Sequence, residues 1–88
     1  MTMKEYEEEK ALLTALEKRD VNAFIRFYKD YGEDALIFTY GLVQDSQEPN
    51  RIVDHLFDKL WAEANFEMIE PPIYKFLIKE IQKNYHQR

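Results

Sequence analysis

The chain has 88 residues, of which 45% are hydrophobic, 15% aromatic and 33% charged, and its net charge is −5 at pH 7. This composition is typical of one small folded domain, and no stretch approaches the roughly 20 apolar residues that a membrane span requires. Two glycines and three prolines are too few for a turn-rich β fold, and the lack of cysteine excludes disulfides and thiolate metal sites. With an acidic N-terminus that has no apolar signal-peptide core, the sequence indicates a cytoplasmic protein.

The charge is unevenly distributed along the chain. Residues 1–70 carry eight Lys/Arg and sixteen Asp/Glu, a net charge of −8, whereas residues 71–88 carry four and one, a net charge of +3. An acidic protein is a poor general ligand for nucleic acid, because phosphate contacts need cations. Any contact with DNA is therefore expected in the last segment.

The first predicted helix runs from the capping box at Thr2–Glu5 to about Lys18, in which Thr2 caps the helix and Glu5 reaches back. Its buried stripe is expected to be Leu12, Leu13 and Leu16. A second helix follows Asp20, a favourable N-cap residue, and runs to about Val43. Gly32 predicts a kink or short break within this helix. Helically spaced apolar residues predict its core face, which comprises Phe24, Phe27, Tyr28, Tyr31, Ala35, Phe38 and Leu42.

A polar loop is expected at 44–48, followed by a strongly amphipathic helix over 49–64 that starts at Pro49. At ~100° per residue one arc of this helix is apolar and the opposite arc is polar. The apolar arc comprises Ile52, Val53, Leu56, Phe57, Leu60 and Ala64. The polar arc comprises Arg51, Asp54, His55, Asp58 and Lys59.

An unusually apolar loop with Phe66, Met68 and Ile69 follows, and Pro71–Pro72 prevents a helix from passing through it. A fourth helix is predicted from Pro72 to about Tyr85. Lys75, Lys79 and Lys83 are four residues apart and therefore line one edge of this helix. Such a row is either a solvated face or an edge that tracks a phosphate backbone, and charge alone does not separate the two.

These elements predict an all-α fold, a compact bundle of about four helices in one domain over residues 1–88. One core is expected to collect the inward residues of three helices: Phe24, Phe27, Tyr31, Phe38, Leu42, Ile52, Leu56, Phe57, Leu60 and Ile81. We predict no enzyme activity, because the sequence has no glycine-rich phosphate loop, no Ser-His-Asp set and no metal-ligand cluster. No cofactor and no metal are expected, and His55 and His86 are interpreted as surface residues.

Several segments, in this order and spacing, resemble region two of bacterial RNA polymerase sigma factors of the extracytoplasmic-function group. The opening is Asp20–Phe24, followed by Phe27-Tyr28 and Tyr31-Gly32. The most recognisable helix is Ile52–Trp61, which ends Phe-x-x-Leu-Trp. A loop with Phe66, a proline, Phe76-Leu77 and a basic turn ending in Asn84 complete the resemblance, which covers about residues 11–88.

The resemblance implies a transcription initiation factor domain that binds the clamp helices of the polymerase largest subunit and recognises and melts the promoter minus-ten element. The implied polymerase-binding residues are Arg51, Asp54, His55 and Asp58. The implied DNA-binding residues are Asn65, Phe66 and Met68, as a pocket for a base flipped from the non-template strand, and Lys75, Lys79 and Lys83 for phosphates. An anti-sigma factor is a further partner that the resemblance admits.

The chain is expected to lack the second promoter-binding domain of a sigma factor, so it is either one domain cut from a longer protein or a standalone relative. The alternative function is a sigma-like adaptor or decoy that binds a protein and no DNA. The acidic body favours this alternative, and the basic fourth helix opposes it. Polymerase pull-down combined with single-strand binding separates the two.

Overall fold

The computed structural model describes residues 1–42 and 49–85, the last two of these as backbone only. Within these ranges the predicted all-α fold is confirmed, with α1 at Met3–Glu17, α2 at Val21–Leu42, α3 at Pro49–Glu63 and α4 at Ile73–Tyr85. A single 3-10 turn, η1 at Phe66–Met68, lies between α3 and α4. The loop predicted at 44–48 and the surface position predicted for His86 lie outside the described residues.

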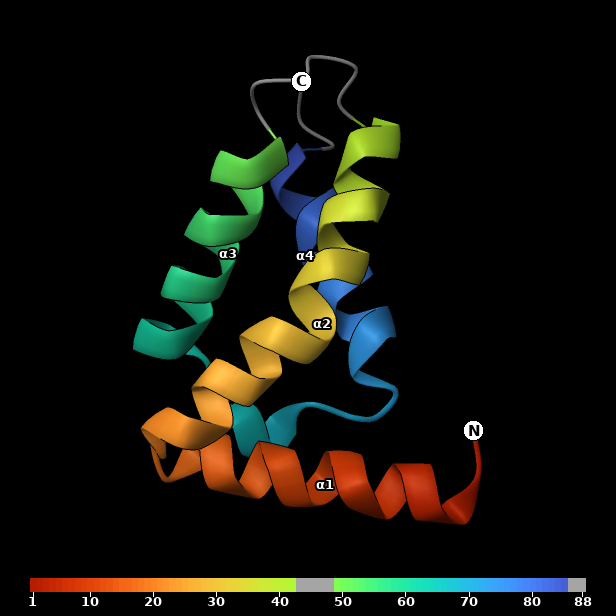
Figure 1. The fold of residues 1–88 in the computed structure, drawn as a ribbon, viewed down its shortest axis with the longest axis vertical. Helices are drawn as coiled ribbons and strands as arrows, with labels where there is room; N and C mark the ends of the chain where they lie inside the picture. Colours follow the sequence, from red (N-terminus) through yellow and green to blue (C-terminus); the bar gives the residue numbers. More distant parts are fainter. Residues whose placement is uncertain (43–48, 86–88) are drawn as a thin grey trace.

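Helices α2, α3 and α4 stand together, and α1 lies crosswise at one end of them (Figure 1). Helix α2 packs against each of the other three helices, and α1 also contacts η1, so the turn between α3 and α4 lies on α1. No helix of the described ranges is both long enough and apolar enough to cross a membrane.

Local signals explain where the first two helices begin. The Thr2 side chain accepts from the Glu5 amide at 3.1 Å and Glu5 accepts from the Thr2 amide at 2.9 Å, so the predicted capping box is present. Asp20 accepts from the amide of Asn22 at 3.0 Å, as expected of an N-cap residue. Helix α2 continues through Gly32 without the short break that was one predicted outcome there.

The core is centred on Phe27, which is fully buried. Its ring centroid lies 4.9 Å from that of Phe57 on α3, 5.7 Å from that of Tyr31 and 6.2 Å from that of Phe66. The predicted residues Ile52, Leu56, Phe57, Leu60 and Ile81 are buried, and Phe24, Tyr31 and Phe38 pack partly buried against the core. The buried stripe predicted for the first helix is also confirmed.

Two residues of the α2 stripe were wrongly predicted to be core. Leu42 is 44% exposed: it is the last residue of α2, and the inward position in that turn is taken by the fully buried Thr39, whose hydroxyl donates to the Ala35 carbonyl at 2.7 Å. Tyr28 is 42% exposed, because its ring packs edge-on against Phe57 while its hydroxyl reaches the surface between α2 and α3. Residues that keep helical spacing along α2 therefore include both buried core positions and partly exposed positions at the edge of the core.

Candidate functional site

The polar face of α3 consists of Arg51, Asp54, His55 and Asp58, which are all exposed, as the helical spacing predicts. Asp54 is fixed from the neighbouring helix, because the Tyr28 hydroxyl of α2 donates a hydrogen bond to its carboxylate. This hydrogen bond, with smaller contributions from burial and from the charges of Asp54 and Asp58, raises the pKa of Tyr28 above its ordinary value. The polar face is therefore a surface shared by α3 and α2.

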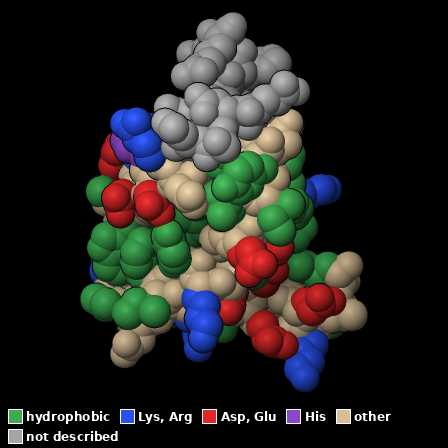
Figure 2. All heavy atoms as spheres, turned by 45° about the horizontal axis from the view of Figure 1, so that its top comes forward, with side chains coloured by type: hydrophobic (Ala, Val, Ile, Leu, Met, Phe, Trp, Pro, Cys, Tyr) green, Lys and Arg blue, Asp and Glu red, His purple; other side chains and the backbone are tan. Residues whose placement is uncertain are grey.

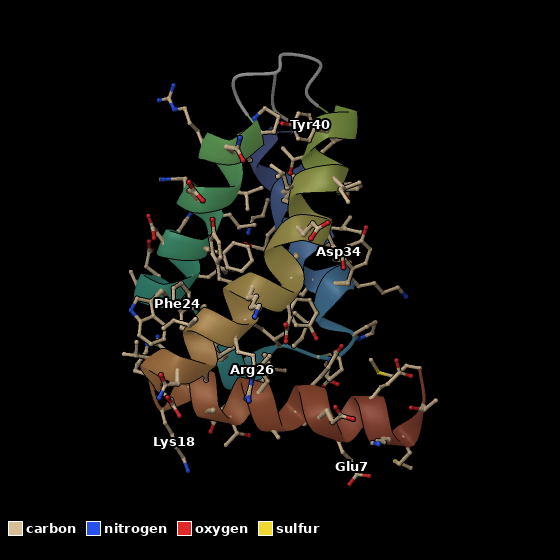
Figure 3. All side chains as sticks on the ribbon, in the orientation of Figure 1. Glu7, Lys18, Phe24, Arg26, Asp34 and Tyr40 are labelled. Atoms are coloured by element: carbon tan, nitrogen blue, oxygen red, sulfur yellow. The ribbon has the colours of Figure 1, made fainter. Side chains whose placement is uncertain are left out.

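An apolar stripe on α2 adjoins this polar face. Val21, Ile25 and Tyr28 follow helical spacing and are 60%, 58% and 42% exposed. Their helix is held against α3 by Phe24, whose ring lies 4.6 Å from that of Trp61 and which projects toward α3 in Figure 3. Figure 2 shows hydrophobic side chains gathered on the α3 side of the molecule, below a group of acidic, basic and histidine side chains. Exposed apolar residues rimmed by charge are typical of protein-binding surfaces.

A groove of about 350 Å³ lies between the C-terminal half of α3, the segment that contains η1, and α4. Its apolar lining is Leu56, Leu60, Ala64, Met68, Ile69 and Phe76, and its polar lining is Lys59, Glu63, Asn65, Glu80 and Lys83. Asn65 and Met68, predicted together as part of a base pocket, and Lys83, predicted to contact a phosphate, thus line the same hollow. Lys75 and Lys79 are exposed on α4 and do not line it.

The structure corrects the predicted pocket at Phe66. This ring is fully buried, in edge contact with Phe27, and the Arg19 guanidinium lies 5.0 Å from its centroid. Such a ring has no open face on which a base can stack. Met68 is 76% exposed and Asn65 is exposed, so the turn presents these two residues outward and turns its aromatic ring inward.

Arg19 holds this turn in place. It follows the C-cap residue of α1 and has a φ of 60°, in the left-handed region that side-chain-bearing residues rarely adopt. Its guanidinium donates to the carbonyls of Leu16 and Ala64, each at 3.0 Å, and lies over the rings of Trp61 and Phe66. One side chain therefore ties the end of α1 to the end of α3, directly before Asn65.

A second hollow, of about 520 Å³, lies between α1 and α2, with Glu5, Glu8, Glu9 and Asp30 in its lining. Arg26 projects from α2 toward α1 into this acidic region (Figure 3). Both carboxylate oxygens of Glu9 accept a hydrogen bond, one from the Tyr31 hydroxyl at 2.9 Å and one from the Ile73 amide at 2.8 Å. Among the described side chains, no group of three or more His, Asp or Glu is arranged to hold a metal ion.

Sequence reasoning missed Lys59 and Phe76 as groove residues and Arg19 as the residue that ties the two helix ends. Lys59 was placed on the polar arc, which the spacing supports, but its position beside α4 depends on how two helices meet. The helix break at residues 19–20 was a usable signal for Arg19, because a residue directly after a helix often adopts the left-handed conformation.

The chain matches no protein-family model, no curated protein and no solved structure.

Proposed function

We propose that this chain is a sigma factor region two-like domain that binds bacterial RNA polymerase core and the single-stranded non-template strand of the minus-ten element. The observation that carries the proposal is that the residues predicted for polymerase and three of those predicted for DNA lie on two separate surfaces, the polar face of α3 and the groove beside α3. The polar face with Asp54 and Asp58 is exposed on one face of the helix, and the groove with Asn65, Met68 and Lys83 opens beside another. A domain with two such surfaces can bridge a protein and a nucleic acid.

Polymerase docking is assigned to the polar face together with the adjoining apolar stripe on α2. The largest-subunit clamp helices are the proposed partner. Asp54 and Asp58 are spaced i and i+4, so their carboxylates lie side by side and can anchor basic residues of a partner helix. The exposed side chains of Val21 and Ile25 supply apolar area beside these charges. An anti-sigma factor is a second proposed partner for the same surface.

DNA contact is assigned to the groove and to the basic edge of Lys75, Lys79 and Lys83. A base taken out of its stack needs an apolar surface and edge contacts to offset a cost of a few kcal/mol. The groove offers Met68 and other apolar side chains together with the amide of Asn65. The basic edge then supplies cations for phosphates that flank the base.

A second candidate function is an adaptor that binds a protein partner without DNA. The groove favours this alternative in one respect, because Glu63 and Glu80 stand in its lining beside the two lysines. Carboxylates repel phosphate, so the groove as a whole is not a basic surface. In this alternative only the polar face and the apolar stripe have a function.

Pull-down of purified bacterial polymerase core tests the docking surface. The variant Asp54→Lys/Asp58→Lys is expected to lose the core while its circular dichroism is unchanged, because both residues are exposed. The matched control is Glu7→Lys/Glu8→Lys, which makes the same change in net charge on α1, where Glu7 points away from the other helices (Figure 3). Equal loss in the control, or retention by the first variant, would exclude the polar face as the docking surface.

A further inference from the structure

Neither η1 nor α4 is capped by the side chain of the residue before it. The first amides of a helix have no partner within the helix, and a nearby side-chain oxygen commonly accepts from them. Asn65 precedes η1, but its side chain makes no capping hydrogen bond. Pro72 precedes α4 and has no side-chain oxygen. The starts of η1 and α4 therefore need acceptors from elsewhere in the fold.

Helix α1 supplies both acceptors. Glu17 accepts from the Glu67 amide at 3.3 Å, and Glu9 accepts from the Ile73 amide at 2.8 Å. Glu9 and Glu17 lie eight residues apart with the buried Leu13 midway between them, so all three belong to one edge of α1. The carboxylate of Glu9 also lies at the N-terminus of α4, where negative charge is favourable. Both starts are thus capped by side chains of a different helix.

The amide that Glu17 occupies is one that Asn65 would otherwise cap. The side chain of an N-cap residue accepts from the second or third amide of its helix, which in η1 are those of Glu67 and Met68. The Met68 amide already donates to the backbone carbonyl of Asn65 at 3.1 Å, and the Glu67 amide donates to Glu17. Both donors are taken, and the side chain of Asn65 lines the groove instead.

Resting on the proposed function for what the groove binds, we infer that α1 caps this segment and that Glu17 thereby leaves the side-chain amide of Asn65 to the ligand of the groove. Glu17 is a positioning residue, because it acts on the ligand only through Asn65. Glu9 has the matching role at the other end of the segment, where it fixes the start of α4.

Amide hydrogen exchange of the full 88-residue chain, followed by NMR, tests the two caps directly. Glu17→Ala is expected to speed exchange of the Glu67 amide at least about twofold, the lower limit for loss of one hydrogen bond. Glu9→Ala is expected to speed exchange of the Ile73 amide at least about tenfold, because this contact is shorter and partly buried. Glu17→Gln and Glu9→Gln keep an oxygen acceptor and are expected to restore most of the protection.

Two controls accompany the exchange experiment. Glu7→Ala changes an exposed glutamate of α1 that points away from the other helices, and it is expected to leave both amides unchanged (Figure 3). Tyr31→Phe removes the other hydrogen bond of Glu9 and leaves its contact with Ile73 in place. Exchange in Glu17→Ala or Glu9→Ala that is no faster than in these controls would exclude the corresponding cap.

A double-mutant cycle tests the consequence for Asn65. The probe is a labelled minus-ten non-template oligonucleotide, titrated with the chain in the presence of polymerase core. Glu17→Ala is expected to weaken binding at least about twofold, because the side chain of Asn65 then turns back to cap η1. In an Asn65→Ala background the same change is expected to have no further effect. Equal weakening in both backgrounds would show a general structural role for Glu17 and overturn the inference.

The outcomes separate this inference from the function on which it rests. A wild-type chain that brings no oligonucleotide to the core would overturn the proposed function, and the free chain would still decide the position of Asn65. In Glu17→Ala, nuclear Overhauser contacts between the Asn65 side chain and the Glu67 amide are expected to appear. Their absence would overturn the release of Asn65 by Glu17, even with both caps confirmed by exchange.

Discussion

Arg19 shows how one side chain can set the geometry of a connection that the hydrophobic pattern does not describe. The residue accepts an unfavourable positive φ, and its guanidinium caps carbonyls of two helices and covers two aromatic rings. Two hydrogen bonds from a charged group contribute about 1.5–3 kcal/mol each, together more than the roughly 1–2 kcal/mol that the left-handed conformation costs. The contacts therefore outweigh the backbone cost.

Replacement of Arg19 by glycine separates the backbone cost of the positive φ from the contribution of the guanidinium contacts, because glycine adopts a positive φ freely and carries no guanidinium. We expect Arg19→Gly to lower the free energy of unfolding by about 1–3 kcal/mol, measured by urea denaturation. Lys29→Ala, at an exposed lysine inside α2, serves as a control and is expected to change little. A gain in stability for Arg19→Gly would show that the backbone conformation, not the side-chain contacts, dominates at this position.

Tyr31 and Glu9 form a second junction, between α1, α2 and the start of α4. Burial, together with the hydrogen bond to Glu9, raises the pKa of Tyr31 well above its ordinary value. The folded chain thus keeps this proton to higher pH than the unfolded chain does. The resulting contribution to stability is complete below about pH 10, the ordinary tyrosine pKa, and is lost as the pH rises toward the folded-state value.

Tyr31→Phe removes this titration. Between about pH 9 and pH 11 the wild-type chain is expected to lose up to about 1 kcal/mol more stability than the variant, a figure reduced for partial exposure. Urea unfolding of both chains at several pH values measures the difference, in which the titration of the lysines largely cancels. Parallel pH profiles for the two chains would contradict the role assigned to Tyr31.

At the scale of elements, helical periodicity predicted α1 to α4 and most of the core, because each helix buries one stripe. It did not predict which way the 3-10 turn orients its side chains. The apolar residues of 66–69 show no helical or strand periodicity. The sequence alone therefore does not distinguish a buried aromatic ring from one that is exposed to bind a ligand. Phe66 is buried because Phe27 and Arg19 surround it, and both are more than 35 residues away in the chain.

The same limit applies to the candidate site. The exposure of the polar face followed from spacing within one helix, and it was predicted correctly. The groove depends on how α3, the segment that contains η1, and α4 are arranged around it, so Lys59, Phe76 and Asn65 share its lining only in the folded chain. Residues that share a helix face can be predicted from the sequence, whereas residues that meet across a helix pair cannot.

The turn offers a matched pair of substitutions. Phe66→Ala is expected to cost about 3–5 kcal/mol, the range for removing a buried aromatic side chain. Met68→Ala, two residues away at a position that is 76% exposed, is expected to change stability by less than about 0.5 kcal/mol. Thermal or urea unfolding gives both values. Similar costs for the two variants would mean that the turn is not oriented as described.

At the scale of the whole molecule, the acidic body opposes nucleic acid binding. Residues 1–70 carry a net charge of −8, so an isolated chain attracts a polyanion weakly, and the proposed role depends on polymerase to hold the domain against DNA. The exposed lysines of the basic edge, Lys75, Lys79 and Lys83, are the cations available on α4.

The triple variant Lys75→Ala/Lys79→Ala/Lys83→Ala is expected to weaken DNA binding in the presence of polymerase core for all sequences alike. The slope of log affinity against log salt concentration should also decrease in magnitude, by about 0.7 for each phosphate contact that is lost on a single strand. Fluorescence anisotropy at several salt concentrations provides both quantities. Unchanged affinity and slope would show that the basic edge is only a solvated face.

The central claim is that this domain joins polymerase to single-stranded promoter DNA. Its most direct test is the anisotropy of a labelled minus-ten non-template oligonucleotide, titrated with the chain, with polymerase core, and with both together. We expect a strong rise only when both are present, and its loss with Asp54→Lys/Asp58→Lys. A chain that binds the core but brings no oligonucleotide to it would support the adaptor, and a chain that binds neither would contradict the proposed function altogether.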